Sequence, residues 1–113
     1  MKIAIASDLH LEFGDINLKN EEDAQVLILS GDITIANDLH DHPEPVTSPY
    51  ASPQNWGRRL ENSYRTRDFF KRVTFQFPHV IYVAGNHEFY DGKWVGSLVH
   101  LRQECAKYPN MYF

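Results

Sequence analysis

Apolar residues gather in three short runs, at residues 2–6, 26–29 and 80–84. Each run is continuous and rich in β-branched side chains, whereas a strand with one face in water alternates between apolar and polar positions. The pattern therefore predicts three strands of a parallel sheet, each buried on both faces.

Two longer segments have helical periodicity. In residues 55–73, Asn55 is a suitable N-cap, and aromatic or aliphatic residues recur at roughly helical spacing at Trp56, Leu60, Tyr64 and Phe70. A second helix ends near Tyr108, because Pro109 follows. Its apolar stripe consists of Trp94, Leu98, Leu101 and Cys105. Its predicted polar side consists of Lys93, Ser97, His100 and Glu104.

The segment between these elements, residues 36–54, has no apolar period. It holds four of the six prolines, at positions 43, 45, 49 and 53. A loop of this length without secondary structure is usually a lid over a functional site or a disordered insertion. We predict a loop insertion here.

The predicted elements form an incomplete α/β fold. A parallel sheet needs cover on both faces, yet only two helices are available. The final residues, Met111, Tyr112 and Phe113, are apolar, follow a Pro-Asn turn and resemble the beginning of a strand. These features predict that residues 1–113 are the N-terminal half of a larger domain, truncated at its C-terminal side.

Composition excludes several classes of protein. A chain of 113 residues holds one domain at most, and 42% hydrophobic residues exclude a disordered tail. One cysteine, Cys105, excludes a disulfide framework and a multi-cysteine zinc site, and indicates inert packing. No stretch has the length of a signal peptide's apolar region or of a membrane span. We expect a soluble, cytoplasmic protein without a membrane partner.

Charge is unevenly distributed. Residues 1–57 carry ten acidic and two basic side chains, and residues 58–113 carry nine basic and five acidic ones, for a net charge of −4. A net-acidic chain is a poor phosphate-neutralising surface, so nucleic acid enters only as a candidate substrate. The basic residues of 58–72 favour a solvated helix face over a phosphate-guiding surface. They are Arg58, Arg59, Arg65, Arg67, Lys71 and Arg72.

Polar residues of metal-ligand type follow each apolar run at once. Asp8 and His10 follow the first run, Asp32 the second, and Asn86 and His87 the third. Ligands of open α/β sheets bind just beyond the carboxyl ends of the strands, so these side chains are expected at one edge. Carboxylate, imidazole and amide oxygen together favour Mn, Fe or Zn over an all-oxygen calcium cage.

These residues suit phosphoryl chemistry. Asp32 has two oxygens and can bridge two cations, and two metals about 3.5–4 Å apart stabilise the attacking and leaving oxygens of a phosphoryl displacement. An imidazole outside the metal shell can protonate the leaving group.

The chain resembles the calcineurin-like metallophosphoesterase family. That family carries D-x-H, then G-D, then G-N-H-[D/E] after successive strands, and Asp8/His10, Gly31/Asp32 and residues 85–88 match these blocks in order. GNHE alone arises by chance in about one chain of this length in a thousand. The resemblance implies the N-terminal half of an α-β-β-α sandwich, with mostly parallel strands and two helices.

The resemblance also implies a function and its residues. It points to hydrolysis of phosphomonoesters or phosphodiesters at a two-metal site, with a metal-bound hydroxide as the attacking species. Asp8 and His10 would hold the first metal, Asp32 would bridge, and Asn86 would bind the second. His87 would be the catalytic histidine that contacts the scissile phosphate. Manganese is the expected metal, and Fe, Zn and Ni remain open.

The chain departs from the family pattern at one point. The family's later lone His and G-H-x-H block are missing. The His40-Asp41-His42 triplet is a poor substitute, because it lacks the glycine and lies in the proline-rich loop. We therefore expect an incomplete site. Two alternatives to an active enzyme follow: a phosphoesterase-fold scaffold that acts as a binding module, and a chain completed by a separate C-terminal half.

Two interpretations of Glu88 remain open. It follows His87 directly and either supports the ligands through a hydrogen bond or places a charge at the start of a helix.

Overall fold

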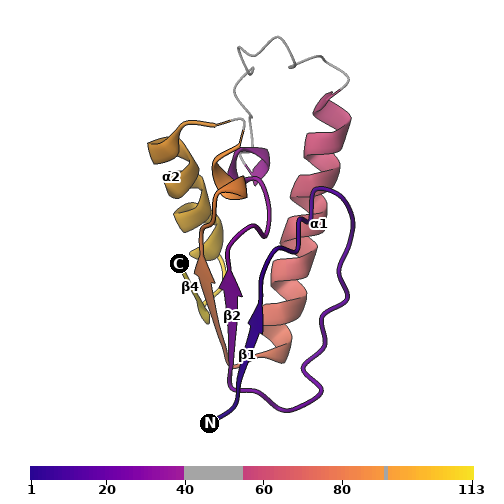
Figure 1. The fold of residues 1–113 in the computed structure, drawn as a ribbon, viewed down its shortest axis with the longest axis vertical. Helices are drawn as coiled ribbons and strands as arrows, with labels where there is room; N and C mark the ends of the chain where they lie inside the picture. Colours follow the sequence, from indigo (N-terminus) through magenta and orange to yellow (C-terminus); the bar gives the residue numbers. More distant parts are fainter. Residues whose placement is uncertain (40–54, 91) are drawn as a thin grey trace.

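The computed structural model describes residues 1–39, 55–90 and 92–113 and shows an α/β fold (Figure 1). Four strands lie in the order β1-β2-β3-β4, and every neighbouring pair is parallel. The strands are β1 (Ile3–Ala6), β2 (Val26–Ser30), β3 (His79–Val83) and β4 (Met111–Tyr112). The helices are α1 (Asn55–Gln76), α2 (Trp94–Cys105) and the 3-10 turns η1 (Ala36–Leu39) and η2 (His87–Phe89). The predicted parallel sheet with two helices is confirmed, as is a strand at Met111.

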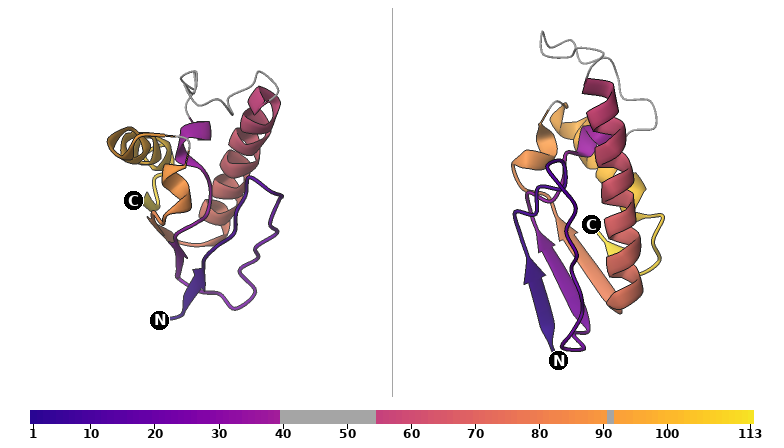
Figure 2. Two further views of the ribbon diagram at one scale, coloured as in Figure 1. Left: turned by 45° about the horizontal axis from the view of Figure 1, so that its top comes forward. Right: turned by 90° about the vertical axis from the view of Figure 1, so that its right-hand side faces the viewer.

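Both α-helices cover the same face of the sheet (Figure 2, right). On that face Leu27, Leu29, Val80 and Tyr82 pack against Phe69, Phe70 and Val73 of α1 and against Leu101 and Cys105 of α2. Within the described residues the opposite face is open, with Ile5 70% and Val83 53% exposed. The prediction that the strands are buried on both faces is therefore wrong for this part of the chain, since no described helix reaches the second face.

Helix α1 extends three residues beyond its predicted end, and its buried side differs from the predicted stripe. Leu60 and Tyr64 are exposed. The inner side of its first half is polar instead, since Asn62 and Thr66 are buried. The Thr34 and Thr66 hydroxyls lie 2.8 Å apart, and Asn62 donates to Asp38 at 2.8 Å. Satisfied polar groups therefore replace the apolar side chains that periodicity led us to expect.

Two arginines of α1, Arg65 and Arg72, bind the long segment that connects β1 and β2. The long β1–β2 connection has almost no hydrogen-bonded structure of its own, so its carbonyls need donors. Arg65 donates to the Leu11 carbonyl at 2.6 Å, and Arg72 to the Ile16 carbonyl at 3.1 Å. The expectation of a solvated basic face is wrong for these two residues. It is also wrong for Arg59 and Arg67, which pair with Asp38 and Glu104.

Helix α2 also departs from its predicted polar side. Ser97 and Glu104 are buried, at 1% and 2% exposed. A buried carboxylate needs partners, and Glu104 receives them from Arg67 at 3.2 Å and Lys107 at 2.8 Å. Burial, with a further contribution from Glu104, raises the pKa of Cys105 to about 12. The thiol therefore stays protonated, which agrees with inert packing.

The predicted loop insertion begins later than residue 36. Residues 36–39 form η1, and all four are buried. The rest of the insertion, including His40, Asp41 and His42, lies outside the described residues. Among the helices that the structure describes, none combines the length and the apolar character that a membrane crossing requires.

Candidate metal centre

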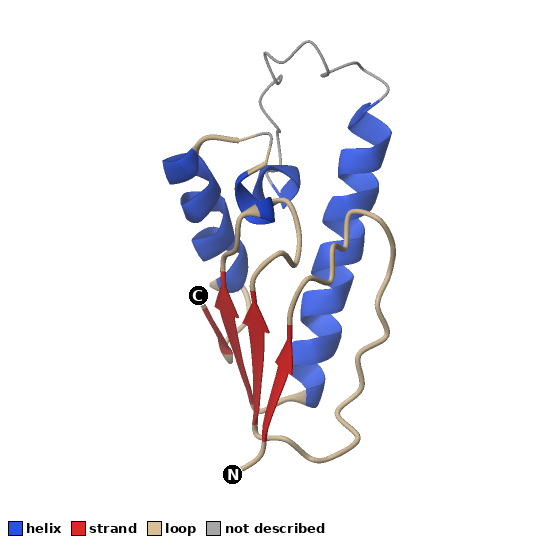
Figure 3. Cartoon of the chain, viewed as in Figure 1, coloured by secondary structure: helices blue, strands red, loops and turns tan. Residues whose placement is uncertain are grey.

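The loops that follow β1, β2 and β3 all leave the sheet at the same edge (Figure 3). Backbone hydrogen bonds continue from the β1–β2 ladder into these loops. Asp8 N–H donates to the Gly31 carbonyl at 3.0 Å, and His10 N–H donates to the Asp32 carbonyl at 3.1 Å. The two segments that carry the predicted ligands are thus joined residue by residue.

The backbone is left-handed at three predicted ligands. The φ angles are 57° at Asp8, 46° at His10 and 54° at Asp32. Residues other than glycine rarely adopt this region, which costs roughly 1–2 kcal/mol per residue, although Asp and His occur there more often than most. Strained backbone of this kind concentrates at functional sites, where the surrounding structure holds it in place.

The strained loops bring three side chains together. One ligand atom each from Asp8, His10 and Asp32 can be chosen so that all lie within 4.8 Å of one another. His10 Nε2 is 4.0 Å from Asp8 Oδ1, and the Asp8 side chain is 65% exposed. Two carboxylates and one imidazole are a donor set that suits a divalent transition metal, and the exposed side leaves room for a ligand to approach.

Two glycines allow the loops to approach closely. Gly31 has a φ of 94°, and a Cβ added there would lie 3.0 Å from Gly85 Cα. A Cβ at Gly85 would lie 2.7 Å from Asp32 Oδ1 and 2.8 Å from Asp32 N. Real Cβ atoms essentially never show contacts as short as those at Gly85, and at Gly31 the left-handed φ and the tight 3.0 Å contact both disfavour a side chain.

Replacing Gly85 by alanine is therefore expected to displace the Asp32 carboxylate. Misplacement of a reacting group by about 1 Å costs on the order of 10²-fold in rate, so any reaction that depends on Asp32 should slow by a comparable factor. Calorimetric titration with Mn²⁺ and a turnover assay measure the effect. Gly96→Ala is the matched control, since Gly96 has no heavy atom within 4 Å of an added Cβ. Unchanged Mn²⁺ affinity in a folded Gly85→Ala protein would contradict this role.

Glu88 holds the β2 and β3 loops together. Its side chain is fully buried and accepts four hydrogen bonds: from the backbone N–H groups of Asp32 (3.0 Å), Ile33 (2.8 Å) and Gly85 (2.8 Å), and from the Tyr82 hydroxyl (2.7 Å). Burial, reinforced by the Glu88 carboxylate, raises the pKa of Tyr82 well above its ordinary value, so the hydroxyl remains a donor. Of the two interpretations of Glu88, the structure shows the one in which its side chain supports a predicted ligand through a hydrogen bond.

His87 lies beside the same cluster. Its backbone N–H donates to Asp32 Oδ1 at 2.7 Å, and its side chain is 15% exposed. The His87 ring meets the His10 ring edge to face, with centroids 4.5 Å apart and planes at 89°. The Tyr90 ring lies 4.2 Å away on another side. Asp8, His10, Asp32 and His87 are therefore all gathered at one edge.

The sequence profile of the calcineurin-like phosphoesterase family matches residues 1–111. The chain belongs to this family. No curated protein and no solved structure gives a significant match to the chain.

For a calcineurin-like phosphoesterase, the geometry brings most of the predicted site residues together. Asn86 has the fewest contacts that tie it to the cluster. It follows β3, its side chain is exposed, and its amide nitrogen is 3.4 Å from the Tyr90 hydroxyl. Its role as a metal ligand stays a prediction, as do the metal-binding roles of Asp8, His10 and Asp32 and the catalytic role of His87.

One residue beside this cluster, Glu12, was not predicted from the sequence. Glu12 contacts both histidines: its Oε1 is 3.3 Å from His10 Nδ1 and also lies against His87 Nε2. Together these three residues form a second group with metal-ligand chemistry. The signal available in the sequence was an acidic residue two positions after His10, in the segment that follows the first strand.

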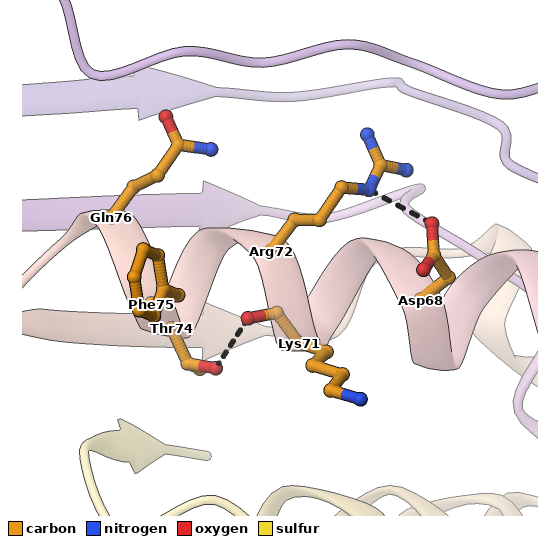
Figure 4. Close-up of a pocket in the computed structure, with 6 residues that line it drawn as sticks. All are labelled: Asp68, Lys71, Arg72, Thr74, Phe75 and Gln76. Carbon is orange, nitrogen blue, oxygen red and sulfur yellow. Dashed lines mark hydrogen bonds and ion pairs between the residues drawn. The ribbon is translucent and has the colours of Figure 1, made fainter.

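One hollow among the described residues lies away from this cluster. It has a volume of about 540 Å³ and is open to solvent on the outer side of α1 (Figure 4). Its lining consists of Asp68, Lys71, Arg72, Thr74, Phe75 and Gln76. All six come from one helix, and none belongs to the cluster at the sheet edge, so this hollow is separate from the candidate metal centre.

Proposed function

We propose that the chain is a metal-dependent hydrolase of phosphomonoesters or phosphodiesters, with its reaction centre at the carboxyl edge of the sheet. The convergence of Asp8, His10 and Asp32, with ligand atoms within 4.8 Å, carries this proposal. Membership of a family of phosphoester hydrolases supports the substrate class. The left-handed backbone at all three members of one cluster supports a functional role, because strained backbone concentrates at functional sites.

The residues divide into two sets of ligands. Asp8 and His10 would hold one divalent ion, and Asp32 would be shared with a second ion that also takes the Asn86 amide oxygen. The bond from His87 N–H to Asp32 Oδ1 orients that carboxylate, whose two oxygens allow contacts to two ions. Mixed nitrogen and oxygen donors suit Mn²⁺, with Fe, Zn and Ni as the other candidates.

The bound ions would lower the pKa of a water and offset negative charge on the phosphoryl group. His87 would provide the proton chemistry. Its Nε2 is engaged by Glu12, so Nδ1 is the ring atom left to hold a proton for a substrate oxygen. Two aromatic rings flank this histidine, Phe13 at 6.3 Å and Tyr90 at 4.2 Å. Both are exposed and would contact the substrate's organic group.

Hydrolysis of bis(p-nitrophenyl) phosphate and p-nitrophenyl phosphate tests the proposal. We expect turnover with Mn²⁺ that EDTA removes. Asp8→Asn replaces a charged ligand by a neutral one and is expected to weaken Mn²⁺ binding roughly tenfold or more. Asp23→Asn is a matched control, because Asp23 is exposed and also left-handed, with a φ of 52°.

The two alternatives give different results in the same assay. A chain that binds Mn²⁺ without hydrolysing either substrate would be an inactive binding module. Hydrolysis that appears only after a second chain with the G-H-x-H block is added would identify a site completed by a separate C-terminal half. Turnover that is equal in the wild-type protein and the Asp8→Asn variant would refute the proposed metal site.

A further inference from the structure

Glu12 is a buried carboxylate placed between two histidines. It lies in the turn after β1, which the Phe13 N–H closes by donating to the His10 carbonyl at 2.9 Å. The turn brings Glu12 Oε1 to 3.3 Å from His10 Nδ1 and into contact with His87 Nε2. The Glu12 side chain is only 9% exposed. One oxygen thus meets ring nitrogens from two different loops.

The other oxygen shows that packing alone does not explain this residue. Among the residues that the structure describes, Glu12 Oε2 has no hydrogen-bond partner, although it is buried. Burying a carboxylate with so few partners is costly, and an apolar side chain of similar size would fill the space without that cost. Packing gives no reason for a carboxylate here, whereas the two histidine contacts of Oε1 do.

The contact to His10 determines which of its ring nitrogens is free. A carboxylate beside Nδ1 accepts the Nδ1–H and leaves the lone pair on Nε2. Nε2 is the atom that lies 4.0 Å from Asp8 Oδ1, on the side of the Asp8–Asp32 cluster. Carboxylates that accept a hydrogen bond from a ligand histidine fix the tautomer and the ring orientation in this way.

The contact to His87 fixes the second ring. With Nε2–H donated to the same oxygen, the His87 ring is held edge to face against His10, at 89°. The two rings therefore share one anchor, and movement of the Glu12 carboxylate would release both. Glu12 does not itself reach the reacting atoms, since both of its contacts are made through histidines.

We propose that Glu12 is the positioning residue of this site: it holds His10 with Nε2 free for a metal and holds His87 in register with it. This inference rests on the proposed phosphoester hydrolysis for its consequence in turnover. Its effect on the tautomers and orientations of the two histidines depends only on the contacts described above, and does not require the proposed function.

The test begins with the metal-free protein. Long-range ¹H–¹⁵N spectra of the imidazoles, recorded above about pH 8 where an ordinary histidine is neutral, report each tautomer directly. We expect the Nδ1–H form at His10 and the Nε2–H form at His87. In Glu12→Leu the His10 tautomer is expected to change. In Glu12→Gln, which keeps an acceptor oxygen, it is expected to be retained. Glu22→Leu, at an exposed position, is the matched control.

Stability and turnover then separate positioning from packing. Because leucine fills the space and removes a buried charge, the urea midpoint of Glu12→Leu is expected to match or exceed that of the wild type. Its kcat is expected to fall about 10–100-fold, the usual loss when a partner of a ligand histidine is removed. KM should change little, since Glu12 makes no substrate contact. Glu12→Gln should recover most of kcat.

The possible failures are distinguishable. If Glu12→Leu keeps both the wild-type tautomers and kcat, the positioning role is overturned while phosphoester hydrolysis stands. If the wild type hydrolyses neither p-nitrophenyl substrate but the tautomer changes as expected, the proposed function fails and the role of Glu12 stands. If Zn²⁺ shifts the ¹⁵N signals of His87 as well as those of His10, a cation sits among His10, Glu12 and His87, and Glu12 is a direct ligand instead.

Discussion

Asp32→Asn is expected to lower the Mn²⁺-dependent kcat for bis(p-nitrophenyl) phosphate by about 10²–10³-fold. Asp32 is the one carboxylate assigned to both metal positions, so its charge acts on both ions. Stabilisation of phosphoryl charge by metals is worth several kcal/mol, and each 1.36 kcal/mol corresponds to a factor of ten in rate. Loss of the shared ligand should therefore exceed the effect of Asp8→Asn.

The same variant should fold normally. Asparagine tolerates a left-handed backbone such as the 54° φ of Asp32, and its side-chain oxygen can still accept the 2.7 Å bond from His87 N–H. Mn²⁺ stoichiometry by calorimetry, together with kcat, measures the effect, and Asp23→Asn again serves as the control. A folded Asp32→Asn protein with undiminished turnover and metal stoichiometry would exclude the bridging role.

Sequence periodicity was enough to find the strands because each is a short apolar run with polar residues directly after it. It did not determine which sides of the helices face inward. Ser97 and Glu104 were placed on the polar side of α2, yet both are buried. A carboxylate can occupy the core there only because Arg67 reaches it from α1, a contact made across 37 residues of sequence. One-dimensional spacing carries no information about such a partner.

In the candidate site, too, some residues were predictable from the sequence and others were not. Asp8, His10, Asp32 and His87 were predictable because each follows directly after a strand, and parallel strands bring their ends to one edge. The supporting carboxylates were not. Glu12 contacts His87 across 75 positions, and Glu88 contacts Asp32 across 56, so neither role is visible from neighbouring residues. The need for glycine at position 85 also comes from a distant residue, because an added Cβ would meet Asp32.

Glu88→Gln is expected to lower the free energy of unfolding by about 3–5 kcal/mol. Each carboxylate oxygen of Glu88 accepts two hydrogen bonds, Oε1 from Ile33 N–H and the Tyr82 hydroxyl, and Oε2 from Asp32 N–H and Gly85 N–H. Glutamine replaces one oxygen by an NH₂ group, which is itself a donor and cannot accept from the two donors that face that position. Hydrogen bonds to charged groups contribute about 1.5–3 kcal/mol each, and a buried N–H left without an acceptor adds its desolvation cost.

Urea unfolding at neutral pH measures this loss, and two further variants identify its cause. Glu21→Gln makes the same chemical change at an exposed position and should leave the midpoint unchanged. Tyr82→Phe removes only the hydroxyl donor at 2.7 Å and should cost about 1.5 kcal/mol, the lower end of the range for a bond to a charged group, because both Glu88 oxygens keep their backbone partners. If Glu88→Gln costs no more than Tyr82→Phe, the backbone bonds contribute little, and Glu88 does not hold the β2 and β3 loops in place. If its cost is several times larger, the geometry of Asp32 depends on a carboxylate that binds no metal, and Mn²⁺ affinity should fall in parallel with stability across the three variants.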